Sequence, residues 1–371
     1  MDKVKEKKKL TKGKKALIII LCVILGIALA SVIFINVVTH PSLDSEKYHA
    51  VGGMVYSETV EYKAESGKPI RHNPVVRLMQ MVWRFCEDGD NAKHAAQTPP
   101  SDVKKEKDYY YISDKNVFHQ LDVYYPENLK EGQKIPAIID IHGGGWIYGD
   151  KNLNEYYCLE LAHKGYLVFN ISYRLVPDVT VNEQLQDCAE ALRWINQKIE
   201  RYPWDGNILL TGDSAGGQMA VYSAALLSSP ELRKTFNVAD GGIKPTALLL
   251  TSPVAFMKDG GAFSIYTKLM WGDYKKKATY NYMDLSEIID KATLPPTYLI
   301  TSSGDSLAHD QTVRAYELLK EKGVECEIKD FGDDENGKPL PHVFSVLEPF
   351  NKSGQEAIDG ALAFYQKQIS K

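Results

Sequence analysis

Short apolar runs alternate with helical stretches from Tyr109 to the end of the chain, and this alternation limits the fold more than any other feature. The runs are rich in Val, Ile, Leu, Tyr and Phe and are bounded by Gly or Pro, so they predict strands. They occupy residues 117–126, 136–142, 165–173, 207–213, 245–253, 296–305 and 324–331. Helices are predicted between the later runs, at residues 183–202, 218–229 and 310–323. Such a pattern implies an α/β fold with a mostly parallel central sheet and helices on both faces.

A long uncharged segment near the N-terminus needs a separate interpretation. Residues 16–38 contain no charged side chain, and residues 1–15 before them contain eight lysines against one Asp and one Glu. At 1.5 Å per residue the segment gives a helix of about 35 Å, enough to cross a hydrocarbon core of about 30 Å. The lysines predict a basic cytoplasmic tail at residues 1–15 and an extracytoplasmic location for the rest. We therefore predict one transmembrane anchor at residues 16–38.

Other interpretations of this segment remain open. Ala28 and Ala30 give the small-x-small form of a signal-peptidase site, and cleavage there would release a secreted protein. Against cleavage, the apolar run continues after Ala30, whereas the apolar part of a signal peptide usually ends after about 7–15 residues. A helix of the soluble core is a further interpretation, but the basic flank and the lack of a polar face argue against it.

The chain between the anchor and the alternating pattern divides into two parts. Residues 39–69 are polar and mixed, without a clear period, and predict a linker or stalk. Residues 74–86 predict a helix, because Pro74 suits a first helical turn and the apolar positions cover more than one face. Residues 88–108 predict a loop, so that the catalytic domain is expected to occupy residues 109–371.

Charge and cysteine content exclude some function classes. The whole chain has a net charge of −4 and the basic tail +6, which leaves −10 for the part after residue 38. An acidic domain argues against a nucleic-acid partner. The cysteines show no metal-like spacing, so no metal site is expected. Outside the cytoplasm, one or two disulfides among Cys86, Cys158, Cys188 and Cys326 are possible, and buried free thiols are the favoured alternative for so large a core.

The stretch TGDSAGG places a serine between a predicted strand and a predicted helix. Gly212, Ser214 and Gly216 fit the G-x-S-x-G pattern of a nucleophile elbow, in which the serine occupies a strained turn and the glycines avoid side-chain clashes. The start of the helix also offers unpaired N–H groups and a positive dipole potential beside the serine. Ser214 is therefore the candidate nucleophile.

A second glycine-rich motif, HGGGW at residues 142–146, follows the strand predicted at residues 136–142. Acyl transfer passes through a tetrahedral oxyanion, and glycines let backbone N–H groups turn toward such an oxygen without obstruction by Cβ atoms. A simple glycine-rich turn is the alternative explanation. The presence of GDSAGG downstream favours the catalytic one.

A nucleophilic serine needs a base and a carboxylate that orients the base. With a nucleophile elbow these residues follow in the order Ser, acid, His. Asp305 lies at the end of a predicted strand, and His342 follows the next strand, so both are expected at the edge of the sheet where Ser214 lies. His309 is the other histidine after Asp305, but it lies just beyond Asp305 where a helix is predicted to begin. Asp305 and His342 are therefore the candidate acid and base.

These motifs together resemble the hormone-sensitive-lipase-like family of α/β-hydrolases, the GDSAG branch of carboxylesterases. The resemblance covers roughly residues 110–370 and rests on HGGGWIYGD, NISYRLVP, DCAEALRWI, GDSAGG, GDSL and HVF in the expected order. It implies an α/β-hydrolase fold, and an oxyanion hole made by the backbone N–H groups of Gly144, Gly145 and Ala215. It also implies a small helical cap, supplied here by residues 70–108 and an insertion at about 254–292.

The sequence thus predicts a membrane-anchored, extracytoplasmic serine carboxylesterase. We expect it to cleave short-to-medium acyl or acetyl esters through an acyl-enzyme, without a metal or organic cofactor. An amide or lactone hydrolase of the same fold is one alternative, and an inactive hydrolase-like binding module is another. The sequence leaves open the acyl chain length, the alcohol and the oligomeric state.

Overall fold

The computed structural model describes residues 12–39, 48–51, 54–57, 74–259, 261–272 and 278–371. The chain divides into two units, Met1–Pro41 and Ser42–Lys371, which are described separately. In the first unit, helix α1 (Lys12–Thr39) includes a part, Lys12–Phe34, that is long and apolar enough to cross a membrane. A signal sequence meets the same criteria of length and composition. The helix therefore leaves open both the anchor and the signal-peptide interpretation of residues 16–38.

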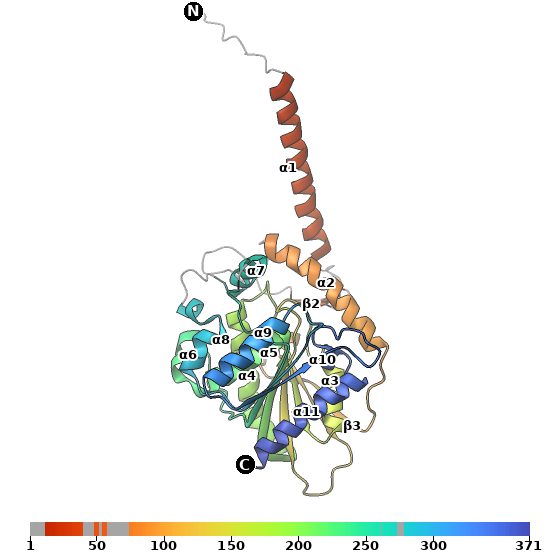
Figure 1. Ribbon diagram of the computed structural model, residues 1–371, viewed down its shortest axis with the longest axis vertical. Coiled ribbons are helices and arrows are strands. Elements are labelled where there is room, and N and C mark those ends of the chain that lie inside the picture. The colour runs from red at the N-terminus through yellow and green to blue at the C-terminus, as the bar shows by residue number, and fades with distance from the viewer. Residues whose placement is uncertain (1–11, 40–47, 52–53, 58–73, 260, 273–277) are drawn as a thin grey trace, which may run out of the picture. The chain divides into compact units, whose positions relative to one another are not determined.

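An eight-stranded sheet with the order β10-β9-β8-β7-β5-β6-β4-β3 forms the centre of the second unit (Figure 1). Its strands are β3 (Val103–Tyr110), β4 (Gln120–Pro126), β5 (Ile135–Ile141), β6 (Leu167–Ile171), β7 (Trp204–Asp213), β8 (Ala247–Thr251), β9 (Thr297–Ser302) and β10 (Cys326–Phe331). The strands from β10 to β6 pair in parallel, and β4 and β3 continue the sheet antiparallel at one edge. The mostly parallel sheet predicted from the sequence is confirmed.

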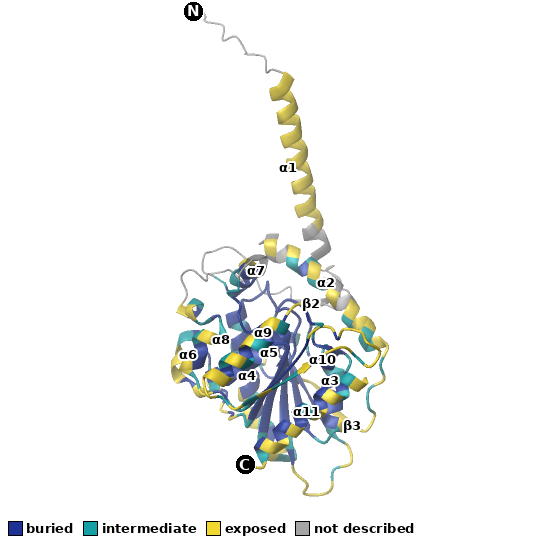
Figure 2. Cartoon of the chain, in the orientation of Figure 1, coloured by how far each residue is buried: buried dark blue, intermediate teal, exposed yellow. Residues whose placement is uncertain are grey.

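Helices cover both faces of this sheet. The α-helices described in the second unit are α2 (Pro74–Ala95), α3 (Glu155–His163), α4 (Val181–Lys198), α5 (Ser214–Ser228), α6 (Pro230–Phe236), α7 (Gly261–Trp271), α8 (Leu285–Ile288), α9 (His309–Glu321), α10 (Phe344–Leu347) and α11 (Lys352–Ile369). Among them, α2 and α7 lie beyond the end of the sheet rather than on a face (Figure 1). Alternate side chains of β5 enter different core clusters, because Ile139 and Ile141 pack with residues of α4 and α5, and Ile138 packs with residues of α3 and α11. Burial on both faces explains the nearly continuous apolar runs in the sequence. Figure 2 shows the buried sheet between helices whose outer sides are exposed.

The segment at residues 88–108 contains regular structure that the sequence did not predict. Residues 88–108 were predicted as a loop, but α2 continues to Ala95, and β3 begins at Val103 and pairs with β4. The composition of β3 explains why this segment was predicted as a loop. Only its first residue is fully buried, and the sequence VKKEKDYY has the charged character of a linker.

The segment predicted as a linker, residues 39–69, also contains regular structure. Strands β1 (Tyr48–Val51) and β2 (Met54–Ser57) pair with each other as a two-stranded antiparallel sheet. Their uninterrupted apolar runs, residues 50–51 and 54–56, are only two and three residues long, which is shorter than the four to eight residues expected of a strand.

The N-terminus of α5 lies very close to the backbone of β5 and β7. A Cβ atom built on Gly216 would lie 2.0 Å from the carbonyl oxygen of Ile141, and one built on Gly212 would lie 2.3 Å from the carbonyl oxygen of Gly216. Both contacts involve backbone atoms, so no change of side-chain rotamer can relieve them. The glycines of the G-x-S-x-G pattern are thus required by the packing of helix against strand, and this packing places Ser214 at the carboxyl end of the sheet.

We expect Gly216→Ala to lower the free energy of unfolding by about 3 kcal/mol or more, because the added methyl group overpacks a rigid backbone contact. Urea denaturation followed by circular dichroism measures this change. Gly332→Ala is the matched control, since a Cβ atom there meets nothing within 4 Å, and its effect should stay within about 0.5 kcal/mol. Equal stability of the two variants would contradict the steric explanation.

Candidate active site

Ser214 lies at the junction of β7 and α5 in a left-handed backbone conformation. Its φ of 51° belongs to a region that residues other than glycine seldom adopt. Such strain persists only where the surrounding structure fixes it, and here the contact of Gly216 with β5 does so. Because Ser214 begins α5, its hydroxyl group lies near N–H groups that have no intrahelical partner. The positive end of the helix dipole lies at the same place.

Ser214 begins a hydrogen-bonded series of three side chains. His342 Nε2 lies 2.9 Å from Ser214 Oγ, and His342 Nδ1 lies 2.9 Å from Asp305 Oδ2. Asp305 follows β9 and His342 follows β10, so two neighbouring parallel strands bring both groups to the same edge of the sheet. The structure therefore brings together the three side chains that the sequence singled out as nucleophile, acid and base.

The carboxyl group of Asp305 is held in one orientation. Its Oδ1 accepts hydrogen bonds from the N–H groups of Leu307 and Ala308, each at 3.0 Å. Burial acts to raise the pKa of Asp305, but the hydrogen bond and the charge of His342 outweigh it and lower that pKa. An ionised Asp305 accepts the Nδ1 proton of His342, which leaves Nε2 as the acceptor facing Ser214.

His309, the other histidine after Asp305, lies outside this series of side chains. It begins helix α9, and its Nε2 lies 3.0 Å from Asp330 Oδ2. The hydrogen bond to Asp330 raises the pKa of His309. The side chain thus takes part in a surface ion pair.

The loop at residues 142–148, called the oxyanion loop below, follows β5 and packs against the β7–α5 junction through Gly143 and Asp213. Gly144 and Gly145 have positive φ values of 92° and 56°. Glycine adopts such values without a steric penalty, which accounts for this part of the HGGGW motif. Trp146 also has a positive φ, of 64°. Its indole Nε1–H donates a hydrogen bond to Gln218 Oε1 at 3.2 Å.

Hydrogen bonds fix the carbonyl groups of the oxyanion loop. The O–H of Tyr173 lies 2.8 Å from the carbonyl oxygen of His142 and 3.0 Å from that of Gly143, so its one proton is shared between these two carbonyl groups. The carbonyl oxygen of Gly144 accepts the N–H groups of Ile147 and Tyr148 at 3.0 and 3.1 Å. In a planar trans peptide the C=O and the next N–H point in opposite directions. These bonds therefore also set the directions of the N–H groups that follow Gly143 and Gly144.

The N–H groups of Gly144, Gly145 and Ala215 are the predicted oxyanion donors. Within the described part of the chain, no backbone carbonyl accepts a hydrogen bond from any of the three. Ala215 belongs to the first turn of α5, where N–H groups have no intrahelical partner. Unpaired N–H groups on fixed peptides can stabilise negative charge that develops on a reacting oxygen.

A pair of buried carboxyl groups lies behind the oxyanion loop. Asn154 Nδ2 donates to Asp140 Oδ2 at 2.9 Å and to Asp213 Oδ1 at 2.8 Å, and Asp213 also accepts the N–H of Gly143. Burial raises the pKa of Asp140 to about 8, and the charge of Asp213 adds to this shift. Burial also raises the pKa of Asp213, to about 6. Both carboxyl groups therefore retain a proton to a higher pH than a free carboxyl group does.

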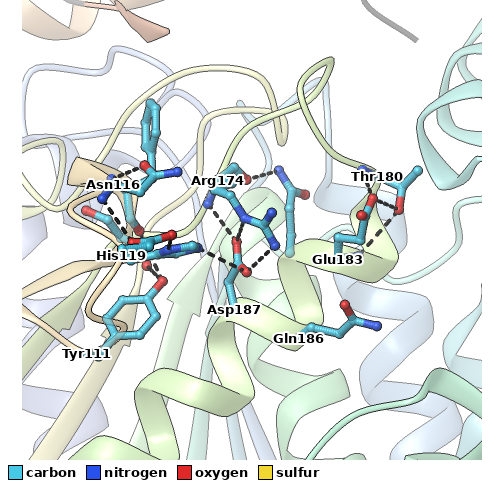
Figure 3. A network of polar contacts seen from close by, with 12 residues as sticks. Tyr111, Asn116, His119, Arg174, Thr180, Glu183, Gln186 and Asp187 are labelled. Atoms are coloured by element: carbon cyan, nitrogen blue, oxygen red, sulfur yellow. Dashed lines mark hydrogen bonds and ion pairs between the residues drawn. The ribbon is translucent and has the colours of Figure 1, made fainter. Parts of the chain in front are cut away.

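A second polar network supports the chain after β6 (Figure 3). Asp187 of α4 accepts hydrogen bonds from Arg174 Nη2 at 2.6 Å and Nε at 2.9 Å, and lies 3.3 Å from His119 Nε2. Burial acts to raise the pKa of Asp187, but the hydrogen bonds from His119 and Arg174 lower it. Gln184 of the same helix donates to the carbonyl oxygens of Trp146 and Arg174, each at 2.8 Å, which links this network to the oxyanion loop.

Sequence reasoning missed the residues that support the oxyanion loop. Tyr173 and Gln184 reach the loop from elements that follow it by more than twenty residues, and Asn154 acts through Asp213, so no local pattern identifies them. A weak signal existed for Asp140 and Asp213, which interrupt otherwise apolar strands. A buried carboxyl group requires a hydrogen-bonding partner, and this requirement alone predicts a polar network at that point.

The cysteines and the acidic residues indicate no other site. All five cysteines are free thiols, and Cys158 and Cys188 are buried. Among the residues that the structure describes, no group of three or more His, Cys, Asp or Glu side chains is arranged to hold a metal ion.

The raised pKa values of Asp140 and Asp213 predict a pH-dependent stability. Because these values exceed the ordinary value of about 3.9, these two carboxyl groups bind more protons in the folded protein than in the unfolded chain between about pH 4 and pH 8. Their contribution to the free energy of unfolding should therefore fall as the pH rises through this range. We expect Asp140→Asn to show a shallower fall between pH 5 and pH 8 in urea titrations.

Asp205→Asn is the control for this measurement, because Asp205 is an exposed carboxyl group outside the pair. It should keep the wild-type slope of unfolding free energy against pH. A slope that Asp140→Asn leaves unchanged would contradict a raised pKa for Asp140.

Comparison with known proteins gives one family model and several similar proteins. A family model described as BD-FAE matches residues 121–246. Esterase LipI of Mycobacterium tuberculosis is 26% identical over 216 residues, which cover 56% of this chain and 66% of that protein. Probable carboxylesterase 6 of Arabidopsis thaliana is 33% identical over 124 residues, 31% of this chain and 37% of that protein. The chain thus spans less than two thirds of the length of these curated relatives.

The similarity to a solved structure is more extensive. Esterase B from Lactobacillus rhamnosis is 31% identical, and the match covers 79% of this chain and 95% of that chain with a TM-score of 0.74. The same esterase inhibited by a tributyrin phosphonate matches with a TM-score of 0.75. The thermostable carboxylesterase EstE1 shares the fold at 21% identity and a TM-score of 0.60. The α/β-hydrolase fold predicted from the motifs is thereby confirmed, and the chain belongs to the α/β-hydrolase family of carboxylesterases.

Proposed function

We propose that this protein hydrolyses carboxylic esters and that Ser214, His342 and Asp305 carry out the reaction. The observation that supports this most directly is the pair of 2.9 Å contacts that joins Ser214 Oγ through the imidazole of His342 to Asp305. A nucleophile, a base and an orienting carboxylate in this geometry suit acyl transfer. Membership in a carboxylesterase family agrees with the same reaction.

The proposed reaction has two halves. In the first, His342 Nε2 takes the proton of Ser214 Oγ while the oxygen attacks the ester carbonyl, and the carbonyl oxygen becomes an oxyanion. The N–H groups of Gly144, Gly145 and Ala215 stabilise that charge. His342 then donates its proton to the leaving alcohol, and the acyl-enzyme remains on Ser214.

In the second half, a water molecule replaces the alcohol. His342 takes a proton from this water, whose oxygen attacks the acyl carbonyl and forms a second oxyanion. The acyl–oxygen bond to Ser214 breaks, the carboxylic acid leaves, and His342 returns the proton to Ser214 Oγ. Asp305 stabilises the imidazolium in both halves. All atoms and charges balance with the ester and one water.

Short-to-medium acyl groups are the proposed substrates. Ser214 is only 7% exposed, and the indole of Trp83 lies beside Gly145 of the oxyanion loop, so side chains limit the space around the reacting carbonyl. Esterase B from Lactobacillus rhamnosis, which is 31% identical, was inhibited by a tributyrin phosphonate. Both observations favour acyl chains of a few carbons over long chains.

We further propose that residues 16–38 anchor the enzyme in a membrane with residues 1–15 in the cytoplasm. On this proposal the catalytic domain lies outside the cytoplasm, tethered through residues 39–69. The uncharged length of α1 and the eight lysines before residue 16 support this topology. Cleavage near Ala30 remains the competing process, and it would give a secreted enzyme.

Hydrolysis of p-nitrophenyl acetate, butyrate, octanoate and palmitate by the full chain in detergent micelles tests the proposed reaction. We expect turnover to fall with chain length, and Ser214→Ala to lower it by about 10⁴-fold or more because the nucleophile is removed. Ser223→Ala, which changes another buried serine of α5, should retain wild-type turnover. Absence of turnover in folded wild-type protein, or a preference for palmitate, would overturn the proposal.

Fractionation of a bacterial host that expresses the full chain tests the anchor. An intact anchor predicts a 41.6 kDa protein that stays in salt-washed membranes and whose catalytic domain is accessible to protease in spheroplasts. Signal-peptide cleavage predicts a shorter, released protein instead. Release that Ala30→Leu prevents would establish cleavage at that site and rule out the anchor.

A further inference from the structure

Two cap helices meet at one carbonyl group of the oxyanion loop. Tyr266 of α7 donates its O–H to the carbonyl oxygen of Gly145 at 3.0 Å, and Trp83 of α2 donates its indole N–H to Tyr266 Oη at 3.0 Å. The two helices come from segments separated by most of the catalytic sheet in the sequence. The hydrogen bonds thus connect both parts of the predicted cap with the loop that holds the oxyanion donors.

The directions of these hydrogen bonds follow from the groups involved. An indole N–H can only donate, and a tyrosine hydroxyl has one proton. Because the hydroxyl of Tyr266 accepts from Trp83, its own proton is available for Gly145. Tyr266 is 1% exposed, so water does not compete for either bond. Successive hydrogen bonds of this kind polarise and strengthen one another.

The bond to Gly145 completes the fixation of the oxyanion loop. The carbonyl oxygens of Gly143 and Gly144 already accept hydrogen bonds from Tyr173 and from N–H groups of the loop itself. Gly145 has a φ of 56°, where glycine has wide conformational freedom. By holding the carbonyl group of Gly145, Tyr266 restrains ψ of that residue and the peptide between Gly145 and Trp146. The bond therefore fixes the chain directly after Gly145, whose own N–H is one of the proposed oxyanion donors.

Helix α2 supports the same loop from its outer side. The indole of Trp83 lies so close to Gly145 that a Cβ atom there would be 2.9 Å from indole Cε2. Its ring also packs beside Tyr148, with 6.1 Å between the ring centroids. Two helical turns further along α2, Asp90 Oδ2 accepts the hydroxyl proton of Tyr148 at 3.0 Å. One face of α2 therefore contacts the loop at two points.

We infer that Tyr266 and Trp83 are positioning residues for ester hydrolysis. They act through Gly145, by holding the oxyanion loop in the geometry that stabilises the transition state. This inference rests on the proposed esterase reaction. It predicts an effect on kcat with little effect on KM, because the oxyanion forms after the ester has bound.

Kinetics with p-nitrophenyl butyrate and the full chain in detergent micelles test this inference. We expect Tyr266→Phe, which removes only the hydroxyl group, to lower kcat about tenfold or more, since losing an oxyanion donor outright costs about 10²–10³-fold. KM should stay within about twofold of wild type. Trp83→Phe should also lower kcat. The loss in the double variant should be smaller than the product of the two single losses, because the two side chains share one hydrogen bond.

The controls are residues with matched hydrogen bonds away from the loop. Tyr365 is buried and donates to the carbonyl oxygen of Ala137 at 3.0 Å, and Trp204 donates its indole N–H to the carbonyl oxygen of Asn207 at 3.0 Å. Tyr365→Phe and Trp204→Phe should leave kcat within about twofold of wild type. Thermal unfolding of all variants separates a loss of folded protein from a loss of rate.

The outcomes distinguish this inference from the proposed function. Wild-type protein without esterase activity, or activity that survives Ser214→Ala, would contradict the proposed function. Active wild-type protein with kcat unchanged in both Tyr266→Phe and Trp83→Phe would overturn the positioning role alone. A rise in KM at constant kcat would likewise overturn it, since that pattern assigns the residues to substrate binding. If Tyr266→Phe fails to fold, Trp83→Phe still decides the question.

Discussion

The close contact between the start of α5 and the end of β5 determines the arrangement of the whole site. With glycine at position 216, the helix backbone approaches the carbonyl oxygens of Ile141 and His142 at a distance that no side chain permits. This approach forces Ser214 into its left-handed conformation and places it beside the loop that leaves β5. One backbone contact thus makes the candidate nucleophile and the proposed oxyanion donors neighbours. Asp305 and His342, which follow β9 and β10, complete the hydrogen-bonded series with Ser214.

The oxyanion loop shows how hydrogen bonds to carbonyl groups can prepare N–H groups for catalysis. Tyr173 and Tyr266 occupy the carbonyl oxygens of Gly143 and Gly145, and N–H groups of the loop occupy that of Gly144. An oxyanion hole needs donors that are unpaired before the reaction and cannot rotate toward other acceptors. The buried carboxyl group of Asp213 holds the other side of the loop by accepting the N–H of Gly143, and Asn154 joins Asp213 to Asp140. The raised pKa values of both carboxyl groups reveal the cost in stability of burying them.

Sequence patterns identified the elements that have a continuous apolar run or a short motif at a fixed place in the chain order. The parallel strands were predictable because both faces are buried, and Ser214, Asp305 and His342 were predictable because each follows a strand in a fixed order. Strand β3 escaped prediction because an edge strand that exposes most of its side chains has the composition of a linker. The end of α2 escaped it because Gly89 and Asp90 favour a loop locally, whereas the contact of Asp90 with Tyr148 is made across the fold.

The position of Trp83 makes pocket size and reaction geometry interdependent. Its ring borders the space beside Gly145, so its volume affects which acyl groups fit, and its N–H supports Tyr266, which holds the carbonyl group of Gly145. A smaller residue at position 83 would enlarge the space and at the same time remove the donor to Tyr266. On the proposed positioning role, a smaller residue at position 83 therefore carries a loss of rate. Pocket size and reaction geometry depend on each other here because the side chain of Trp83 borders the space beside Gly145 and also supports the oxyanion loop.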